Sequence, residues 1–257
     1  MAARKASERD SWLRYQSPSV VSEYARQSEL QPAEQELFAK HLRRDMSILD
    51  IGVGGGRTTP YLAGLTDRYV GIDYSEAMVD ACRSRFPDQR FEWGDASDLT
   101  RFADGSFDAV IFSFNGIDTL GADGRSRCLS EIARVLTDGG VFIFSSHNAR
   151  RLVVVPTLRG VGPVRAVLRL GRAGVRTVQI ATRALLSGAY RAGEGYLVDP
   201  VHGGLLMYTS TPQTMEPQLR AVGLNIVDVV SAGAPEPRPM RSTGWYYYAC
   251  VRSPRGA

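Results

Sequence analysis

A glycine-rich loop is the first part of the sequence whose residue types suggest chemistry. Gly52, Gly54 and Gly56 follow a short apolar stretch, residues 46–51, and precede a predicted helix. Because glycine lacks a side chain, such a loop lets backbone N–H groups and the positive end of the helix approach a polar ligand. Asp73 lies 21 residues after Gly52, at the end of the next apolar stretch. A carboxylate there can accept both hydroxyls of a ribose, so the loop and the acid predict a nucleoside-containing cofactor.

The spacing of this loop argues against two common nucleotide sites. A dinucleotide-binding fingerprint needs glycine at position 57, where the chain has Arg57. The Gly-Lys-Ser/Thr sequence of a phosphate-binding P-loop does not occur. A nicotinamide-dependent oxidoreductase stays open as an alternative, which titration with both cofactors would decide.

A resemblance to a known family follows from the loop Asp50-Ile-Gly-Val-Gly-Gly-Gly56 and from Gly94-Asp-Ala-Ser-Asp-Leu99. Both are similar to motifs of the class I S-adenosylmethionine-dependent methyltransferases of the small-molecule type, and the resemblance covers about residues 19–148. It implies S-adenosylmethionine as the cofactor, with adenine beside Asp95 and Ala96 and with Asp50 near the methionine amine. The cofactor-binding residues that it implies are Tyr24, Asp50, Gly52, Gly54, Gly56, Asp73, Asp95, Ala96 and Phe114.

Strand and helix patterns alternate along the chain, which favours a parallel sheet with helical crossovers. The sequence predicts one α/β domain over 1–257: a Rossmann-like, doubly wound, seven-stranded and mostly parallel sheet with an antiparallel last strand. The expected strands are 46–51, 68–73, 89–93, 107–114, 141–146, 224–230 and 245–252. The last two are expected to pair antiparallel at a sheet edge, where Tyr246 or Tyr248 could face an acceptor. The helices of residues 19–45 are expected over the cofactor, although Tyr24 could serve helix packing alone.

The segment 149–203 is predicted to be an arginine-rich helical insertion after the fifth strand. Residues 150–193 hold nine arginines and no acid, whereas the rest of the chain has 22 Lys and Arg against 27 Asp and Glu. Five arginines recur at helical spacing on one face: Arg165, Arg169, Arg172, Arg176 and Arg183. The segment is either a solvated face or a cationic lid over an anionic acceptor. Contact with a membrane surface or RNA would use the same charges.

The expected catalytic residue is His147, because among the three histidines it alone ends a predicted core strand. A hydroxyl acceptor needs a base to remove its proton, and imidazole can do this. The alternative, in which His147 only bonds to loop backbone, stays open. Asn115, Asp118 and Asn148 fall at the same carboxyl edge of the sheet, and His202 could enter from the end of the insertion.

The predicted function is methyl transfer to oxygen or nitrogen of a small-molecule acceptor, anionic or of sugar or natural-product type. A non-catalytic cofactor-binding module is a further alternative. Nucleic acid is not the expected acceptor, because Ser113-Phe-Asn-Gly116 stands where base-amine methylases have Asn/Asp-Pro-Pro-aromatic. With three cysteines and no C-x-x-C pair, no metal site is expected. No apolar run reaches the ~20 residues of a membrane span, and the polar N-terminus favours a cytoplasmic protein.

Overall fold

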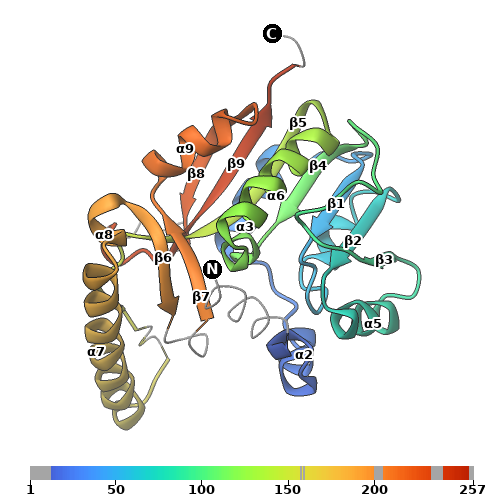
Figure 1. The fold of residues 1–257 in the computed structure, drawn as a ribbon. Helices are drawn as coiled ribbons and strands as arrows, with labels where there is room; N and C mark the ends of the chain where they lie inside the picture. The colour runs from blue at the N-terminus through green and yellow to red at the C-terminus, as the bar shows by residue number, and fades with distance from the viewer. Residues whose placement is uncertain (1–12, 157, 159, 200–204, 233–239, 255–257) are drawn as a thin grey trace.

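The structure is a computed structural model that describes residues 13–156, 158, 160–199, 205–232 and 240–254. A twisted sheet runs through its centre (Figure 1). Five parallel strands follow the order β3-β2-β1-β4-β5. They are β1 (Ile48–Ile51), β2 (Tyr69–Asp73), β3 (Arg90–Trp93), β4 (Phe107–Phe112) and β5 (Leu136–Asn148). The mostly parallel, Rossmann-like arrangement predicted from the alternating pattern is confirmed.

Helices cover both faces of the sheet, as a doubly wound fold requires. Alternate residues of β4 point to opposite faces, so Val110 and Phe112 belong to one core and Ala109 and Ile111 to the other. On the first face pack α6 (Ala122–Val135) and α9 (Pro212–Arg220), and on the second pack α3 (Pro32–His41), α4 (Thr59–Leu62) and α5 (Glu76–Arg85). Ser75 caps α5, because its hydroxyl accepts the Met78 N–H.

The C-terminal strands pair antiparallel, as predicted, but the final strand does not form the edge. The last strand, β9 (Trp245–Arg252), lies between β5 and β8 (Leu224–Ser231), so β8 forms this edge. Tyr247 and Tyr248 of β9 are fully buried between layers of the core. The prediction that an edge strand presents Tyr246 or Tyr248 is therefore wrong, because β9 is not an edge strand.

Within the described residues the sheet has nine strands rather than the predicted seven. The additional two, β6 (Glu194–Asp199) and β7 (Leu205–Ser210), pair antiparallel with each other. His147 of β5 pairs with Thr209 of β7 on one side and with Trp245 of β9 on the other. The hairpin strand β7 therefore extends the sheet beyond the end of β4, on the side where the parallel strands end.

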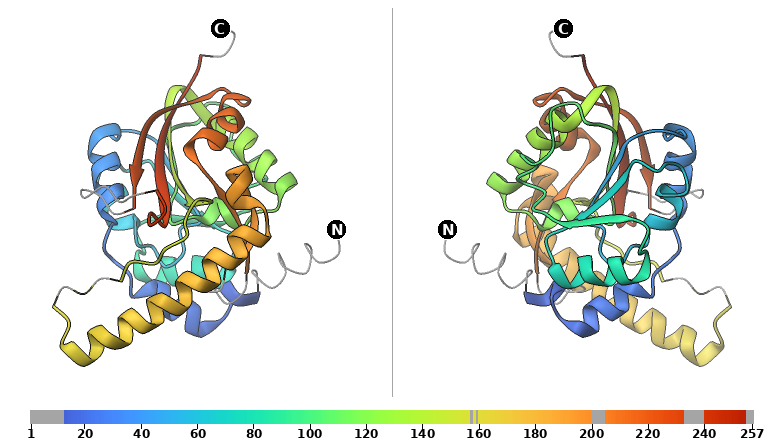
Figure 2. Two further views of the ribbon diagram at one scale, coloured as in Figure 1. Left: turned by 90° about the vertical axis from the view of Figure 1, so that its left-hand side faces the viewer. Right: turned by 90° about the vertical axis from the view of Figure 1, so that its right-hand side faces the viewer.

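The insertion carries α7 (Pro163–Leu186) and the short α8 (Ala189–Ala192), which confirms its predicted helical character. α7 contacts β6 and α8 at the outside of the hairpin. Figure 2 shows α7 as a long rod whose first turns extend past the rest of the molecule. In the part of the chain that the structure describes, no helix has both the length and the apolar character needed to cross a bilayer.

Candidate active site

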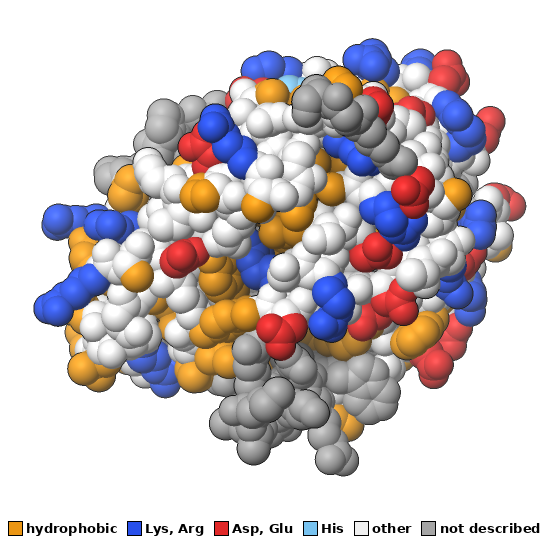
Figure 3. Space-filling model, turned by 45° about the horizontal axis from the view of Figure 1, so that its top comes forward, with side chains coloured by type: hydrophobic (Ala, Val, Ile, Leu, Met, Phe, Trp, Pro, Cys, Tyr) orange, Lys and Arg blue, Asp and Glu red, His pale blue; other side chains and the backbone are white. Residues whose placement is uncertain are grey.

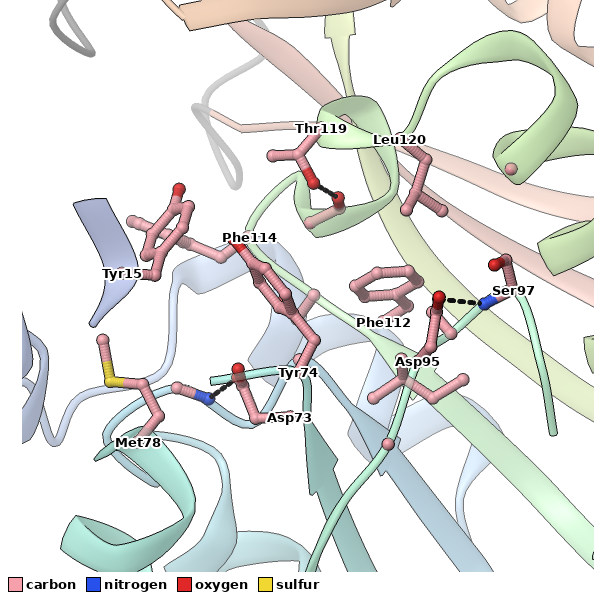
Figure 4. Close-up of a pocket in the computed structure, with 18 of the residues that line it drawn as sticks. Tyr15, Asp73, Tyr74, Met78, Asp95, Ser97, Phe112, Phe114, Thr119 and Leu120 are labelled. Atoms are coloured by element: carbon pink, nitrogen blue, oxygen red, sulfur yellow. Dashed lines mark hydrogen bonds between the residues drawn. The ribbon is translucent and has the colours of Figure 1, made fainter. Parts of the chain in front are cut away.

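A pocket of about 490 Å³ opens at the carboxyl ends of β1, β2 and β4 (Figure 4). Its size falls in the range of small-molecule sites. Seven of the nine cofactor-binding residues expected from the sequence line it: Tyr24, Gly52, Gly54, Asp73, Asp95, Ala96 and Phe114. Asp50 and Gly56 are not part of its described lining. Topology explains the convergence, because parallel strands end at one edge of a sheet and deliver their following loops there.

Asp73 joins the end of β2 to the glycine loop. One carboxylate oxygen, Oδ2, accepts the Gly54 N–H at 2.9 Å, and Oδ1 accepts the Ser75 N–H at 2.9 Å. Burial raises the pKa of Asp73 to about 6, although these backbone donors oppose the shift. A carboxylate has about four lone-pair sites, so two backbone bonds leave capacity for a further donor from the pocket.

The glycine loop passes directly beneath α2 (Pro18–Ala25). A Cβ at Gly55 would lie 2.4 Å from the backbone of Tyr24, so only glycine permits this approach. Gly54 has φ of +54°, a left-handed conformation, and a Cβ there would meet the Tyr24 ring at 3.2 Å. Tyr24 therefore packs on the loop and lines the pocket, and its role in covering the cofactor stays a prediction.

Asp95 and Ala96 follow β3 and line the pocket on a different side from Asp73 (Figure 4). The Asp95 carboxylate accepts the Ser97 N–H at 2.8 Å, which fixes the turn. Ala96 is buried and belongs to the core beside this turn.

Asp50 holds the frame of the loop. Its Oδ2 accepts the Thr58 hydroxyl at 2.6 Å and the Tyr69 hydroxyl at 3.0 Å. Burial raises the pKa of Asp50 to about 6. Asp50 also lines a small cavity that adjoins Gly52, Tyr24 and Arg57. Asp50 thus supports the glycine loop through its hydrogen bonds, and its role near a methionine amine stays a prediction.

A buried ion pair attaches α3 to the loop, and the sequence reasoning did not find it. Arg57 donates to both carboxylate oxygens of Glu34, at 2.5 and 2.6 Å, and Glu34 is fully buried. Ser113 and Gln31 add donors to the same carboxylate. Arg57 occupies the position where a dinucleotide fingerprint has glycine, so the residue that argued against that fingerprint has a structural task here. An acid inside a helix gave no signal that it pairs with this arginine.

The segment after β4 has an unusual backbone. Phe114 and Asn115 both have positive φ, 56° and 62°, which is uncommon for residues other than glycine. Such conformations cluster at functional sites. Phe114 lines the pocket, and the Arg57 guanidinium lies 4.9 Å from the centre of its ring. This places Phe114 in the site as expected and links it to the Glu34 ion pair.

Two further tyrosines line the pocket that the sequence reasoning missed, Tyr15 and Tyr74. Their rings meet edge to face at 6.1 Å, and Tyr15 meets Tyr24 in the same way at 5.9 Å. The Tyr74 hydroxyl is buried, and the described residues offer it no hydrogen-bond partner. Tyr74 could have been found from the sequence, because it directly follows Asp73 at the end of β2.

His147 and Asp118, both expected at this edge, form a hydrogen-bonded pair. The imidazole Nδ1 lies 2.8 Å from Asp118 Oδ2, and the same oxygen accepts the His147 backbone N–H at 2.7 Å. Ser146 donates to the other oxygen at 2.7 Å, so the buried Asp118 is fully held. Asp118 belongs to the 3-10 helix η1 (Gly116–Thr119), whose Gly116 and Thr119 line the pocket.

His147 itself is not among the described residues that line the pocket. The other expected histidine, His202, lies outside the described residues. Asn148 donates to the carbonyls of Met240 and Thr243, which ties the end of β5 to the segment before β9. The described lining also includes no residue of α7, so the lid role of the insertion stays a prediction.

Known proteins are similar to part of the chain. Residues 49–144 match the family described as Methyltransferase domain. A demethylmenaquinone methyltransferase of Beutenbergia cavernae is 41% identical over 101 residues, which are 39% of this chain and 40% of the relative. An O-methyltransferase of Penicillium expansum is 35% identical over 105 residues, 38% of this chain and 37% of the relative. The matches thus span about two fifths of these relatives.

Solved structures share the fold over most of the chain. A methyltransferase from Mesorhizobium loti, named as S-adenosylmethionine-dependent, covers 86% of this chain and 98% of its own, with TM-score 0.61 and 19% identity. The 1,6-didemethyltoxoflavin-N1-methyltransferase of Burkholderia thailandensis, solved with S-adenosylhomocysteine, covers 87% of this chain and 78% of its own. Its TM-score is 0.57 at 18% identity. These likenesses establish the fold.

The described site fits the cofactor of this family. Gly52 and Gly54 line the pocket without side chains, and among the described residues the buried Tyr74 hydroxyl has no hydrogen-bond partner. Asp73 can accept ribose hydroxyls, and Asp95 with Ala96 can meet an adenine. S-adenosylmethionine supplies an electrophilic methyl group when bound. Over residues 49–144 the chain is thus similar to a methyltransferase domain, in agreement with the resemblance of its motifs to class I S-adenosylmethionine-dependent methyltransferases.

Proposed function

We propose that the protein transfers the methyl group of S-adenosylmethionine to an oxygen or nitrogen atom of a small-molecule acceptor. The observation that carries this proposal is the pocket, which continues from the Asp73 and Asp95 turns to η1 and the start of α6. Seven of the residues expected to bind the cofactor line the part of the pocket beside the glycine loop and the ends of β2, β3 and β4. Thr119, Leu120 and Arg127 line the remainder, which provides both polar and apolar contact for an acceptor.

The geometry of His147 supports a role as general base. Asp118 Oδ2 lies within hydrogen-bond distance of Nδ1, so a proton held at Nδ1 leaves Nε2 as the basic nitrogen. Because Asp118 precedes Thr119 of the pocket wall, a small displacement of η1 or an intervening water could connect the imidazole with an acceptor. An amine acceptor would need only to be neutral and correctly placed, with no base.

The names of the relatives support an acceptor of low molecular weight. One relative is named for demethylmenaquinone and one for O-methylation. The matched residues cover less than half of each relative, so acceptor identity is proposed at the level of a class. An anionic acceptor and a cytoplasmic location stay predictions in this proposal.

Calorimetric titration with S-adenosylmethionine and with a nicotinamide cofactor tests the first half of the proposal. Binding of S-adenosylmethionine alone is the expected result, and preference for the nicotinamide would overturn the assignment. The second half is tested by release of S-adenosylhomocysteine with a panel of phenols, sugars, amines and carboxylates. A protein that binds the cofactor but releases no product beyond the acceptor-free control would be the non-catalytic module instead.

A further inference from the structure

α7 presents two chemically different surfaces to the outside of the molecule. At 3.6 residues per turn, its five arginines fall within about 60° around the helix axis. These arginines are Arg165, Arg169, Arg172, Arg176 and Arg183. Beside them lies a face of exposed Val and Leu side chains, which consists of Val164, Val167, Leu168, Val175, Val178, Leu185 and Leu186. Val164 is 74% exposed, Val167 69% and Leu186 83%.

The third side of α7 is held against the body of the protein. Ala173 and Ala184 are buried there, and the Thr177 hydroxyl accepts the Val154 N–H at 3.0 Å. Small residues therefore dock the helix, and its larger apolar residues point away from the core. This is opposite to the usual amphipathic helix of a globular protein, whose apolar stripe faces inward.

The segment that contains α7 supplies no acid to the arginine stripe, and Arg183 at its end donates to the Val198 carbonyl of β6 at 3.1 Å. Residues 150–193 hold no Asp or Glu. The next acid along the chain, Glu194, accepts hydrogen bonds from Tyr208 and Gln218 in the hairpin and α9. Figure 3 shows basic and hydrophobic side chains next to one another at the left edge, the side that α7 occupies. Positive charge and apolar surface are thus gathered on one projecting element.

We propose that α7 docks the protein on the surface of an anionic lipid bilayer. A helix that lies in the interface buries its Val and Leu face at the acyl boundary while its arginines contact the anionic headgroups. With 24 residues, α7 is about 36 Å long, which suits a helix parallel to the bilayer. The proposal concerns where the protein works, and it does not depend on the acceptor of the methyl group.

Two other occupants fit these observations less well. A second copy would bring a second all-arginine stripe beside the first, and α7 has no acid to pair with it. RNA would satisfy the arginines but would leave the exposed Val and Leu face without a partner. A bilayer with anionic headgroups satisfies both surfaces, so it is the occupant that the charge and the exposure favour.

Flotation with vesicles tests the charge contribution. We expect binding to equal mixtures of phosphatidylcholine and phosphatidylglycerol, weak binding to phosphatidylcholine alone, and a loss of binding as salt rises. Since each arginine near an anionic surface strengthens binding about fivefold, the R169Q/R172Q/R176Q variant should bind on the order of 100-fold more weakly. The charge-matched control R43Q/R44Q/R220Q removes exposed arginines of the body and should bind as wild type does.

Two more variants test the apolar contribution. Val178→Trp places a fluorophore on the exposed face, and its emission should shift to the blue with anionic vesicles and be quenched by brominated lipid. The V167S/V175S/V178S variant should keep the wild-type circular dichroism, because these side chains are exposed, and should lose vesicle binding.

Absence of binding to anionic vesicles at low salt would overturn the proposal. Equal weakening in the two arginine variants would overturn it as well, since net charge alone would then explain the binding. A dimer in sedimentation velocity that the serine variant dissociates, without vesicle binding, would assign the face to a second copy. Arginine-dependent binding of an RNA hairpin without vesicle binding would assign the stripe to RNA.

Discussion

The region from β1 to β4 and the region from α7 to β7 differ in what their residues are required to do. In the first, the pocket is formed by backbone and by a few fixed side chains, among them Asp73, Asp95 and Phe114. In the second, α7 contributes small residues to packing and turns its large ones outward. The first region therefore has position-specific requirements, whereas the second has requirements on charge and exposed surface.

This difference predicts that one substitution is enough to disturb the pocket, whereas α7 is disturbed only when several residues are changed together. A single atom at Gly55 would collide with α2, whereas a Cβ at Gly171 or Gly174 of α7 meets nothing within 4 Å. Chemistry in the pocket depends on individual residues. The docking proposed for α7, in contrast, depends on the sum over five arginines and a row of aliphatic side chains. Predictions for the pocket can thus be made one residue at a time.

The largest expected effect belongs to His147, which lies where the two regions meet. If the acceptor is a hydroxyl, His147→Ala should lower kcat by about 10²–10⁴-fold, because a positioned base typically contributes that much. Cofactor affinity measured by calorimetry should stay unchanged. Activity should recover in part at high pH, where the acceptor loses its proton without help.

His41→Ala is the matched control for this experiment, since His41 pairs with Asp228 away from the pocket. Asp118→Asn tests the charge of the partner: it should lower kcat as well, because a neutral amide stabilises the imidazolium formed on proton transfer less than the carboxylate at Nδ1 does. An unchanged kcat in His147→Ala would exclude a general base and favour an amine acceptor.

The buried pair between Glu34 and Arg57 should give the next largest effect, on stability. Glu34→Ala would leave the Arg57 guanidinium buried without its carboxylate, which typically costs about 3–5 kcal/mol. Chemical denaturation measures this change. Exposed Glu76→Ala in the first turn of α5 serves as control and should change stability far less. Equal losses in the two variants would show that α3 is not attached to the loop through this pair.

Much of the first region could be predicted from the sequence because its constraints are local. A glycine loop, an acid at a strand end and an Asp-Ala pair each mark the end of one strand. The Glu34–Arg57 pair could not be predicted, since its two members lie on separate elements and neither stands in a recognisable motif. The pairing of β7 with β5 was equally hidden, because residues 205–209 were not among the expected strands and nothing in their sequence identifies a neighbour.

Asp73 should affect cofactor binding by a smaller amount. Asp73→Ala removes an acceptor of ribose hydroxyls and should weaken S-adenosylmethionine by about 1–3 kcal/mol in calorimetry. Asp95→Ala should weaken it similarly and reduce discrimination against an inosine analogue. Asp98→Ala is the control, because Asp98 bonds only to Thr100 among the described contacts of its side chain. If Asp73→Ala binds S-adenosylmethionine with wild-type affinity, Asp73 does not bind the ribose and the pocket does not depend on this residue.

The smallest effect is a pH dependence of cofactor affinity. Burial raises the pKa of both Asp73 and Asp50 to about 6. A ligand hydroxyl that donates to a carboxylate favours its ionised form, so protons and cofactor compete for that group. The dissociation constant should therefore be flat above pH 6 and rise as pH falls below it, approaching about tenfold per pH unit. Asp73→Asn should flatten this dependence, whereas Asp50→Asn should retain it. The reverse result would mean that the cofactor contacts Asp50, beneath the glycine loop, and not Asp73 at the end of β2.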